Sequence, residues 1–218
     1  RGLVVVVGGA RVGASALAAE ASARGGAGYV RLIADEAARV SHAVVQSQVC
    51  SFDKAKSVLV GPGLGRDEQA RASLVSALQS GAPVVADADA LWHLAQADMP
   101  SLPVPAIVTP HDGEFAGLFP HVTGSKVDRA RQAAAAGSVV IFKGSDTVIT
   151  APDGRTVVCP RASSWLSTAG TGDVLAGLCA SRLAIGGDPF IAACEAVWLQ
   201  SEAARLAGPA FAADDLIR

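Results

Sequence analysis

Charged residues are scarce in this sequence. They make up 17% of its 218 positions, against 50% for hydrophobic residues. Disordered chains show the opposite balance, so the composition indicates a compact protein with many buried strands. The net charge of -2 carries no basic excess. We therefore expect neither nucleic acid nor a membrane surface as a partner.

Cysteine is also sparse, since the chain has four cysteines. Their spacing contains no CxxC pair and no zinc-type combination with histidine, which argues against a zinc site or a disulfide framework. We expect reduced thiols and a cytoplasmic protein. The four residues are Cys50, Cys159, Cys179 and Cys194.

Long apolar runs are absent as well. None approaches the roughly 20 residues that a membrane span requires, and the first residues lack the anatomy of a signal peptide. Composition is uniform along the chain, without a linker or an internal repeat, so we expect one domain over residues 1–218. The chain begins directly on a strand-like run without an initiator methionine. A fragment of a longer polypeptide with an upstream domain would begin in the same way.

Short apolar runs alternate with helix-forming stretches along the first two thirds of the chain. This alternation is typical of βαβ units and predicts an α/β fold with a mostly parallel sheet. The expected strands are residues 3–7, 29–33, 57–60, 83–86, 106–108 and 139–142, and the intervening helices include 14–24, 68–79 and 126–136.

The pattern changes after residue 142. Residues 147–150 and 156–159 flank Pro152, Asp153 and Gly154, which predicts an antiparallel hairpin near the end of the sheet. Mostly helix follows. Residues 174–184 and 189–206 are apolar around much of their circumference, so we expect both helices to pack closely against the sheet.

A glycine-rich turn over residues 170–173 leads directly into the first of these helices. Unpaired amides of Gly170, Thr171 and Gly172 at the positive end of a helix form a natural site for phosphate oxygens. Asp173 stands at the same place, where its carboxylate could accept a proton from a hydroxyl beside the phosphate. The alternative is that Asp173 only caps the helix.

Lys143 ends a buried strand and begins the segment Lys143, Gly144, Ser145, Asp146 and Thr147. A lysine in this position can place a positive charge on a phosphate, and glycine lets the backbone approach a ligand closely. The alternative is a surface lysine before a hairpin.

The segment TPHDGE, residues 109–114, also follows a strand. Loops at the carboxyl ends of parallel strands line the ligand crevice, so His111 is a candidate for substrate contact and Glu114 for magnesium bound through water. Helix capping is the alternative for this segment. The loops 60–65 and 85–91 join the same edge, where Asp87 and Asp89 could orient hydroxyls or metal-bound water.

The glycines of residues 8–14 follow the first strand but do not match the GxGxxG spacing of a dinucleotide-binding fold. No acidic residue closes the second strand at the expected distance. A Rossmann interpretation is therefore disfavoured.

Taken together and in order, these motifs resemble the ribokinase-like superfamily and, more narrowly, the NAD(P)H-hydrate dehydratase family. The matching segments are GGARVGASALAAEASARGGAGYV, VGPGLG, DADAL, TPHDGE, FKGSDTVI and STAGTGDVLAGL. Each is weak alone, but the ordered set is specific and runs along nearly the whole chain. The resemblance implies a three-layer αβα sandwich.

The resemblance also implies an activity. Members of this family use ADP, or ATP in other branches, to phosphorylate the C6 hydroxyl of hydrated NADH or NADPH. Phosphate then leaves and NAD(P)H is restored, with AMP or ADP as the by-product. Mg²⁺ accompanies the nucleotide.

The family's functional residues can be carried over to matching positions. Asp173 would be the base, and the substrate would contact Ala14, Gly63, His111 and Asp173. The nucleotide would bind Lys143, Gly144, Ser145, Asp146 and Thr147 together with Gly170, Thr171 and Gly172. Glu114 resembles the acidic residue that organises magnesium.

Two other functions stay open at this point. One is a ribokinase-like kinase for a vitamin precursor or sugar, and the other is an inactive nucleotide-binding regulator. By the same resemblance we expect a homo-oligomer such as a tetramer, and a fused or separate epimerase partner. The sequence does not decide between ADP and ATP or between the two hydrated cofactors.

Overall fold

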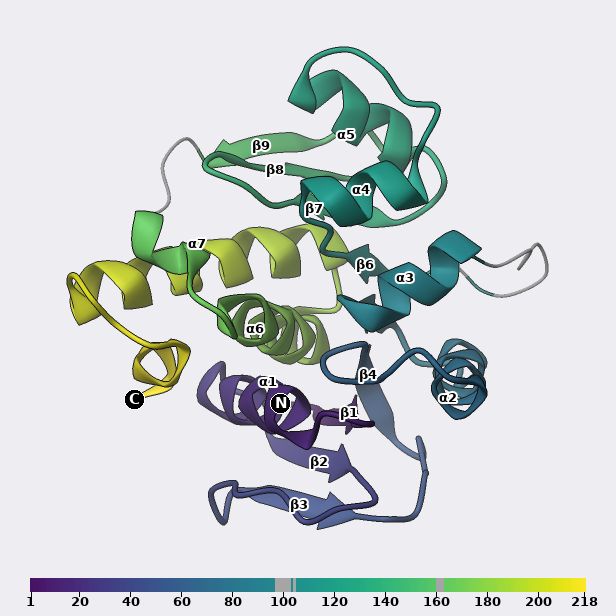
Figure 1. Cartoon of the computed structure of the whole chain (residues 1–218), viewed down its shortest axis with the longest axis vertical. Helices are drawn as coiled ribbons and strands as arrows, with labels where there is room; N and C mark the ends of the chain where they lie inside the picture. Colours follow the sequence, from purple (N-terminus) through teal and green to yellow (C-terminus); the bar gives the residue numbers. More distant parts are fainter. Residues whose placement is uncertain (97–102, 104, 160–162) are drawn as a thin grey trace.

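A computed structural model describes residues 1–96, 103, 105–159 and 163–218 of the chain. Within these residues, nine strands form one sheet in the order β3-β2-β1-β4-β5-β6-β7-β8-β9 (Figure 1). Neighbours from β3 to β7 are parallel, whereas β8 and β9 are antiparallel. The strands are β1 (Leu3–Val7), β2 (Tyr29–Ile33), β3 (Val44–Ser47), β4 (Ala55–Val60), β5 (Val84–Ala86), β6 (Ile107–Val108), β7 (Val139–Phe142), β8 (Thr147–Thr150) and β9 (Thr156–Cys159). The predicted parallel sheet with a final hairpin is confirmed.

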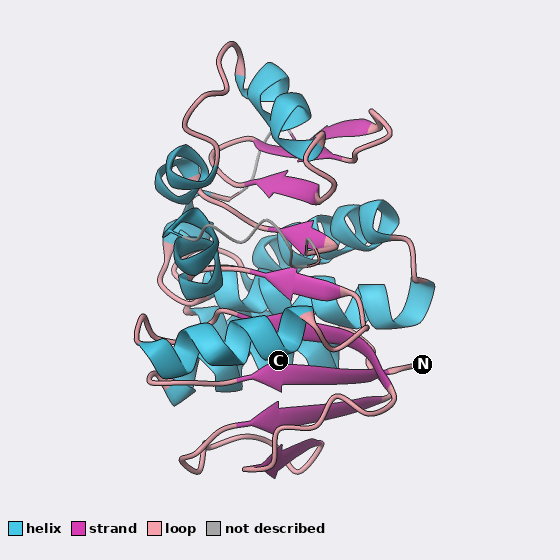
Figure 2. Ribbon diagram, turned by 90° about the vertical axis from the view of Figure 1, so that its right-hand side faces the viewer, coloured by secondary structure: helices cyan, strands magenta, loops and turns pink. Residues whose placement is uncertain are grey.

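Helices cover both faces of this sheet, as Figures 1 and 2 show. On one face lie α1 (Val12–Arg24), α6 (Thr171–Gly186) and α7 (Pro189–Ala207). On the other lie α2 (Glu68–Leu78), α3 (Asp89–Gln96), α4 (Asp112–Leu118) and α5 (Lys126–Ala134). Two short 3-10 helices, η1 (Ser164–Ser167) and η2 (Ala213–Ile217), follow the hairpin and end the chain. The predicted three-layer αβα sandwich is therefore correct.

Strand β1, in the interior of the sheet, contributes side chains to both cores. Val4 and Val6 point to the α1–α6–α7 side, and Val5 and Val7 point to the opposite side. Alternate side chains of a strand face opposite ways, so a strand buried on both faces is apolar throughout. Each buried valine contributes roughly 1.5–3 kcal/mol to folding.

Close packing of α1 against α6 sets the position of the α6 N-terminus. A Cβ at Gly177 would lie 2.2 Å from the Ala18 carbonyl oxygen, so the two helices approach more closely than any larger residue allows. The Ser22 hydroxyl donates to the Gly177 carbonyl at 3.0 Å and to the Ala18 carbonyl at 2.9 Å. The alanine-rich sequence of α1 is what permits this contact.

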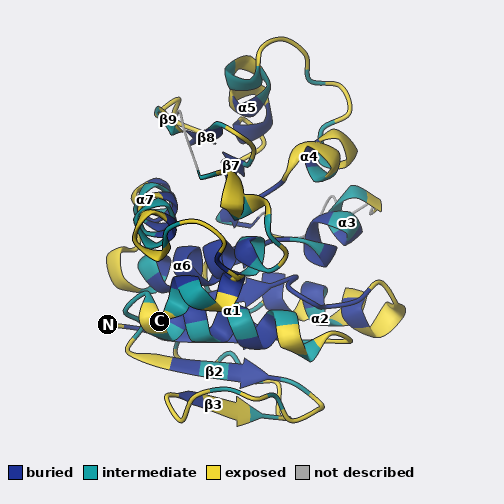
Figure 3. Ribbon diagram, turned by 60° about the vertical axis from the view of Figure 1, so that its left-hand side comes forward, coloured by how far each residue is buried: buried dark blue, intermediate teal, exposed yellow. Residues whose placement is uncertain are grey.

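Three features differ from the sequence-based expectation. Strand β3 and helix α3 were not predicted, because β3 is a short, half-exposed edge strand and α3 begins within a segment that we took to be a loop. The expectation that α7 packs closely is wrong for one face, where Ile191, Trp198 and Leu206 are exposed, Trp198 by 62%. In Figure 3, α6 is by contrast mostly buried, with ten of its 16 residues buried.

No helix within the described residues has the length and apolar character needed to cross a bilayer.

Candidate active site

Four strand-to-helix loops, the β7–β8 connection and the N-terminus of α6 meet at one edge of the sheet. The loops follow β1, β4, β5, β6 and β7, and all of these strands are parallel, so their carboxyl ends lie together. Open α/β sheets bind their ligands at this edge. The residues expected to be functional come from these loops, from the β7–β8 connection with the first residue of β8, or from the first turns of α1, α4 and α6.

Among the described residues, the first turn of α6 leaves the backbone amides of Gly172 and Asp173 available, whereas the Thr171 amide donates to the Thr168 carbonyl at 3.4 Å. Gly170, with φ of 90°, is the N-cap and has no side chain to occupy them. The turn is fixed from outside by two hydrogen bonds of Thr171: its hydroxyl donates to the Leu166 carbonyl at 2.6 Å, and its carbonyl accepts from Gln200 Nε2 at 2.6 Å. Amides held in this way form a rigid anion site at the positive end of a 16-residue helix.

Asp173 lies in this first turn and is half-buried. No capping hydrogen bond from its side chain occurs among the described residues, so helix capping does not account for it. Burial raises the pKa of the Asp173 carboxyl to about 7; the charge of Asp87 adds to this effect, and Lys143 and Arg11 oppose it. A carboxyl with this pKa can accept a proton near neutral pH.

Lys143 lies at the centre of the carboxylates. Its Nζ donates to Oδ1 of Asp87 at 3.0 Å and lies 3.9 Å from Oε2 of Glu114. Burial alone would lower the pKa of Lys143, but the charges of Asp87, Glu114 and Asp173 outweigh it and raise the pKa. The lysine is therefore charged, and its side chain is only 18% exposed. The alternative of a surface lysine is wrong.

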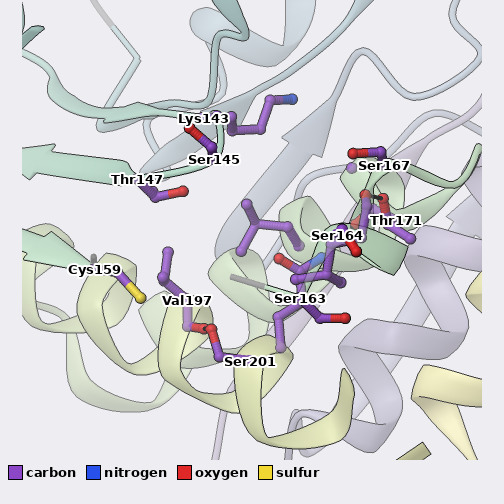
Figure 4. A pocket seen from close by; sticks show the side chains of 15 residues that line it. Lys143, Ser145, Thr147, Cys159, Ser163, Ser164, Ser167, Thr171, Val197 and Ser201 are labelled. Carbon is purple, nitrogen blue, oxygen red and sulfur yellow. Dashed lines mark hydrogen bonds between the residues drawn. The ribbon is translucent and has the colours of Figure 1, made fainter. Parts of the chain in front are cut away.

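A pocket of 370 Å³ opens between the β7–β8 connection and the segment from η1 to α7 (Figure 4). The side chains that Figure 4 labels there include Lys143, Ser145, Thr147 and Thr171. Of the eight residues predicted to bind nucleotide, six line this pocket: Lys143, Gly144, Ser145, Thr147, Thr171 and Gly172. The other two do not. Gly170 is the N-cap of α6, and the Asp146 carboxylate pairs with Lys126 at 3.0 Å.

The other residues predicted to contact the substrate come from the first turn of α1, the loop after β4 and the start of α4. Ala14 and Gly63 lie together, since a Cβ on Gly63 would be 3.2 Å from the Ala14 Cβ. The backbone of Arg11 donates to the Gly63 carbonyl at 2.9 Å and ties the two loops to each other.

His111 lies at the start of α4 as its N-cap. Its Nδ1 accepts from the amides of Gly113 and Glu114 at 3.0 and 3.2 Å, and Oε2 of Glu114 accepts from the His111 amide at 2.9 Å. The capping alternative is therefore correct for this segment. The outer face of the ring remains free for a ligand, because the His111 side chain is 61% exposed.

The described residues contain no cluster of three or more histidine, cysteine or acidic side chains arranged to hold a metal ion. Glu114 is already engaged by His111 and Lys143. A magnesium ion that keeps most of its water and takes its other ligands from a nucleotide fits this donor set, because Mg²⁺ needs only one or two protein carboxylates when phosphates are present.

Asp87 and Asp89 each bind basic side chains of the protein. Asp87 is 2% exposed and accepts from Lys143 and from the Thr109 hydroxyl at 2.6 Å. Asp89 accepts from Arg66 at 3.1 Å and from Arg11. Ala88 between them has φ of 48°, a strained value for a residue with a side chain, and this turn sends the two carboxylates to different partners. The position of Asp87 and Asp89 directly after a buried strand indicated that they are functional. Their spacing in the sequence did not indicate that Arg11 and Arg66 bind Asp89.

Known proteins share both this sequence and this fold. The family model for NAD(P)H-hydrate dehydratase matches residues 4–216. A bifunctional NAD(P)H-hydrate repair enzyme from Salinibacter ruber is 35% identical over 95% of the chain and 44% of its own length. The ADP-dependent (S)-NAD(P)H-hydrate dehydratase of Bacillus subtilis is 33% identical over 69% of the chain and 55% of its own length.

The solved structure of the Bacillus subtilis ADP/ATP-dependent NAD(P)H-hydrate dehydratase, co-crystallised with ATP and Mg²⁺, superimposes with a TM-score of 0.81 and 26% identity. The match covers 99% of this chain and 86% of that one. The chain spans about half the length of the two sequence relatives. Since the family model covers almost every residue that builds the site, the chain belongs to the NAD(P)H-hydrate dehydratase family.

Proposed function

We propose that this chain repairs hydrated NADH and NADPH with ADP as the phosphoryl donor. The observation that carries the proposal is the Asp173 carboxyl, with a pKa of about 7, in the uncapped first turn of α6. This arrangement puts a base for an alcohol beside a site for phosphate oxygens. Phosphoryl transfer to a hydroxyl needs both in one place.

The reaction would begin with the substrate hydroxyl at C6. Asp173 accepts its proton while the oxygen attacks the terminal phosphorus of ADP, and AMP leaves. The transfer forms an O–P bond at the C6 oxygen. The C6–O bond then breaks with phosphate as the leaving group, the ring nitrogen supplies the electron pair, and loss of a proton from C5 restores the dihydronicotinamide. The products are NAD(P)H, AMP, inorganic phosphate and the proton.

The nucleotide would occupy the 370 Å³ pocket, with its phosphates directed to the α6 amides and Lys143. Gly144, Ser145 and Thr147 line the approach, and Gly172 leaves room beside the lysine, whose Nζ would lie 3.5 Å from a Cβ there. Asp146 and Gly170, which do not line the pocket, would contact the nucleotide at the edge of the pocket. Mg²⁺ held by the phosphates, with Glu114 contacting it through water, would neutralise charge on the transferring group.

The hydrated cofactor would lie over the loops on the other side of Asp173. Gly63 and Ala14 would face it from one side and His111 from the other. Its two nucleosides need an extended surface, and the edge from β1 to β6 offers one.

The length of the relatives bears on whether a second enzyme works with this chain. Repair enzymes named bifunctional are about twice as long as the matched part, so we propose that an epimerase is fused to this domain or acts beside it.

The four cysteines are free, which fits a reducing cytoplasm. The exposed residues Ile191, Trp198 and Leu206 on α7 would support a homo-oligomer such as a tetramer.

The test is turnover of hydrated NADH with ADP, followed by recovery of dihydronicotinamide absorbance and by release of AMP and phosphate. ATP and hydrated NADPH are compared in parallel. Recovery with stoichiometric AMP supports the proposal. A stable phosphorylated product from a vitamin precursor or sugar would instead identify a kinase, and nucleotide binding without any turnover would identify a regulator.

A further inference from the structure

Two exposed arginines share one buried carboxylate beside the substrate loops. Asp89 is 3% exposed, and its Oδ1 accepts from Nε of Arg66 at 3.1 Å. Its Oδ2 accepts from the Gly65 amide at 3.0 Å and from a terminal nitrogen of Arg11. The side chains of Arg11 and Arg66 are 65% and 59% exposed. One carboxylate therefore holds two guanidinium groups side by side at the surface.

Most donors of this pair are free for a ligand. A guanidinium has five N–H donors, and within the described residues each of these side chains uses one nitrogen to bind Asp89. Arg66 also lies over the ring of Trp92, 5.2 Å from its centroid, which limits its movement. Two positive charges on one negative charge leave a net positive charge, and the buried Asp89 fixes its position.

The pair lies on the substrate side of Asp173. The Arg11 amide donates to Gly63, and the charge of Arg11 is near enough to Asp173 to lower its pKa against the effect of burial. Neither arginine lines the pocket that holds Lys143 and Thr171. The phosphates of ADP are thus assigned to a different place, and the free donors of the two arginines remain for a second anion.

We propose that Arg11 and Arg66 bind the diphosphate that joins the two nucleosides of the hydrated dinucleotide, with Asp89 as their positioning residue. This assignment rests on the proposed function. A diphosphate presents two adjacent anionic groups, and neighbouring guanidinium groups match them with paired hydrogen bonds.

The experiment compares a dinucleotide with a substrate that lacks the diphosphate. Arg11→Gln and Arg66→Gln are assayed with hydrated NADH and with hydrated reduced nicotinamide mononucleotide. Arg205→Gln, which removes an equally exposed arginine paired with Glu202 on α7, is the control. The KM for hydrated NADH should rise roughly tenfold in each site variant, as expected for loss of a charged hydrogen bond. The KM for ADP and the KM for the mononucleotide should stay unchanged. The kcat should also stay unchanged when it is measured well above pH 7, where Asp173 is ionised with or without the charge of Arg11.

Binding of the product NADH, followed by its fluorescence, gives a second readout that needs no turnover. Its Kd should rise by the same factor in both site variants and not in Arg205→Gln. Unchanged KM and Kd in active Arg11→Gln and Arg66→Gln would overturn the assignment and leave the proposed function intact. Absence of turnover in the wild-type protein would overturn the proposed function itself, and the NADH binding comparison would still decide for or against the arginine site.

Discussion

Lys143 Nζ lies 3.0 Å from Oδ1 of Asp87, a carboxylate that is 2% exposed and also accepts the Thr109 hydroxyl. This pair joins the ends of β5 and β7 and points the lysine at the α6 N-terminus, where a Cβ on Gly172 would be 3.5 Å from Nζ. Asp87 therefore places the positive charge of Lys143 beside the first turn of α6.

Asp87→Asn should destabilise the protein by about 3 kcal/mol, because it leaves a mostly buried lysine without its main partner. Urea denaturation measures this change. Asp214→Asn, an exposed change of the same type, should be nearly neutral. Equal effects of the two substitutions would show that the Lys143–Asp87 pair contributes no stability.

The pH dependence of kcat/KM should follow Asp173. Because burial raises the pKa of its carboxyl to about 7, the base is protonated and inactive below that pH and ionised above it. The rate should rise tenfold per pH unit below about pH 7 and level off above it. Asp87→Asn should move this limb to lower pH, since Asp87 is one cause of the raised pKa. A profile flat from pH 5 to 8 would contradict the assignment of the base.

The Asp173 carboxyl should also make stability depend on pH, and in the opposite direction: activity rises with pH, whereas the free energy of unfolding falls. Its folded pKa of about 7 is above that of an unfolded aspartate, about 4. Between these pH values the folded state binds more protons, so the free energy of unfolding contributed by this group falls as pH rises. Asp173→Asn should leave Tm unchanged near pH 4 and raise it progressively up to pH 8. A Tm difference that does not depend on pH would refute the raised pKa.

Gly63→Ala should harm both stability and substrate binding. Gly63 has φ of 67°, and a Cβ there would lie 2.1 Å from the Arg11 carbonyl oxygen. Gly81 has φ of 76° with nothing within 4 Å of such a Cβ, so Gly81→Ala carries the same backbone cost without the clash. The backbone cost is roughly 1–2 kcal/mol in both.

We expect Gly63→Ala to lose at least about 1 kcal/mol more than Gly81→Ala and to raise the KM for the hydrated cofactor, because the Arg11 and Gly63 loops must separate. Thermal unfolding and steady-state kinetics measure the two effects. Equal stability and equal KM in the two variants would show that the loops accommodate the methyl group.

The sequence predicted the α/β sandwich because its central strands are apolar runs bounded by glycine-rich turns. The run at residues 3–7 is unambiguous for this reason. Strand β3 was missed because an edge strand needs only one buried residue, Val44, and shows no clear alternation. Helix α3 was missed because it begins at Asp89, inside a loop motif.

The candidate site was predicted in part. Asp173 and Lys143 follow from local features, a glycine turn before a helix and a lysine after a strand. The ion pairs that orient them were not predictable, because Lys143 and Asp87 are 56 positions apart, and Arg11 and Asp89 are 78 apart. Local sequence carries no information about which distant charges meet; the folded sheet edge brings them together.

The most direct test of the account is a comparison of wild type and Asp173→Asn in the presence of ADP, Mg²⁺ and hydrated NADH. The rate of AMP release in a single turnover should fall by about 10²- to 10⁴-fold in the variant, because a general base usually contributes a factor of this size to the rate. The Kd for ADP should stay within a factor of a few. AMP release at the wild-type rate would contradict the claim that Asp173 activates the hydroxyl.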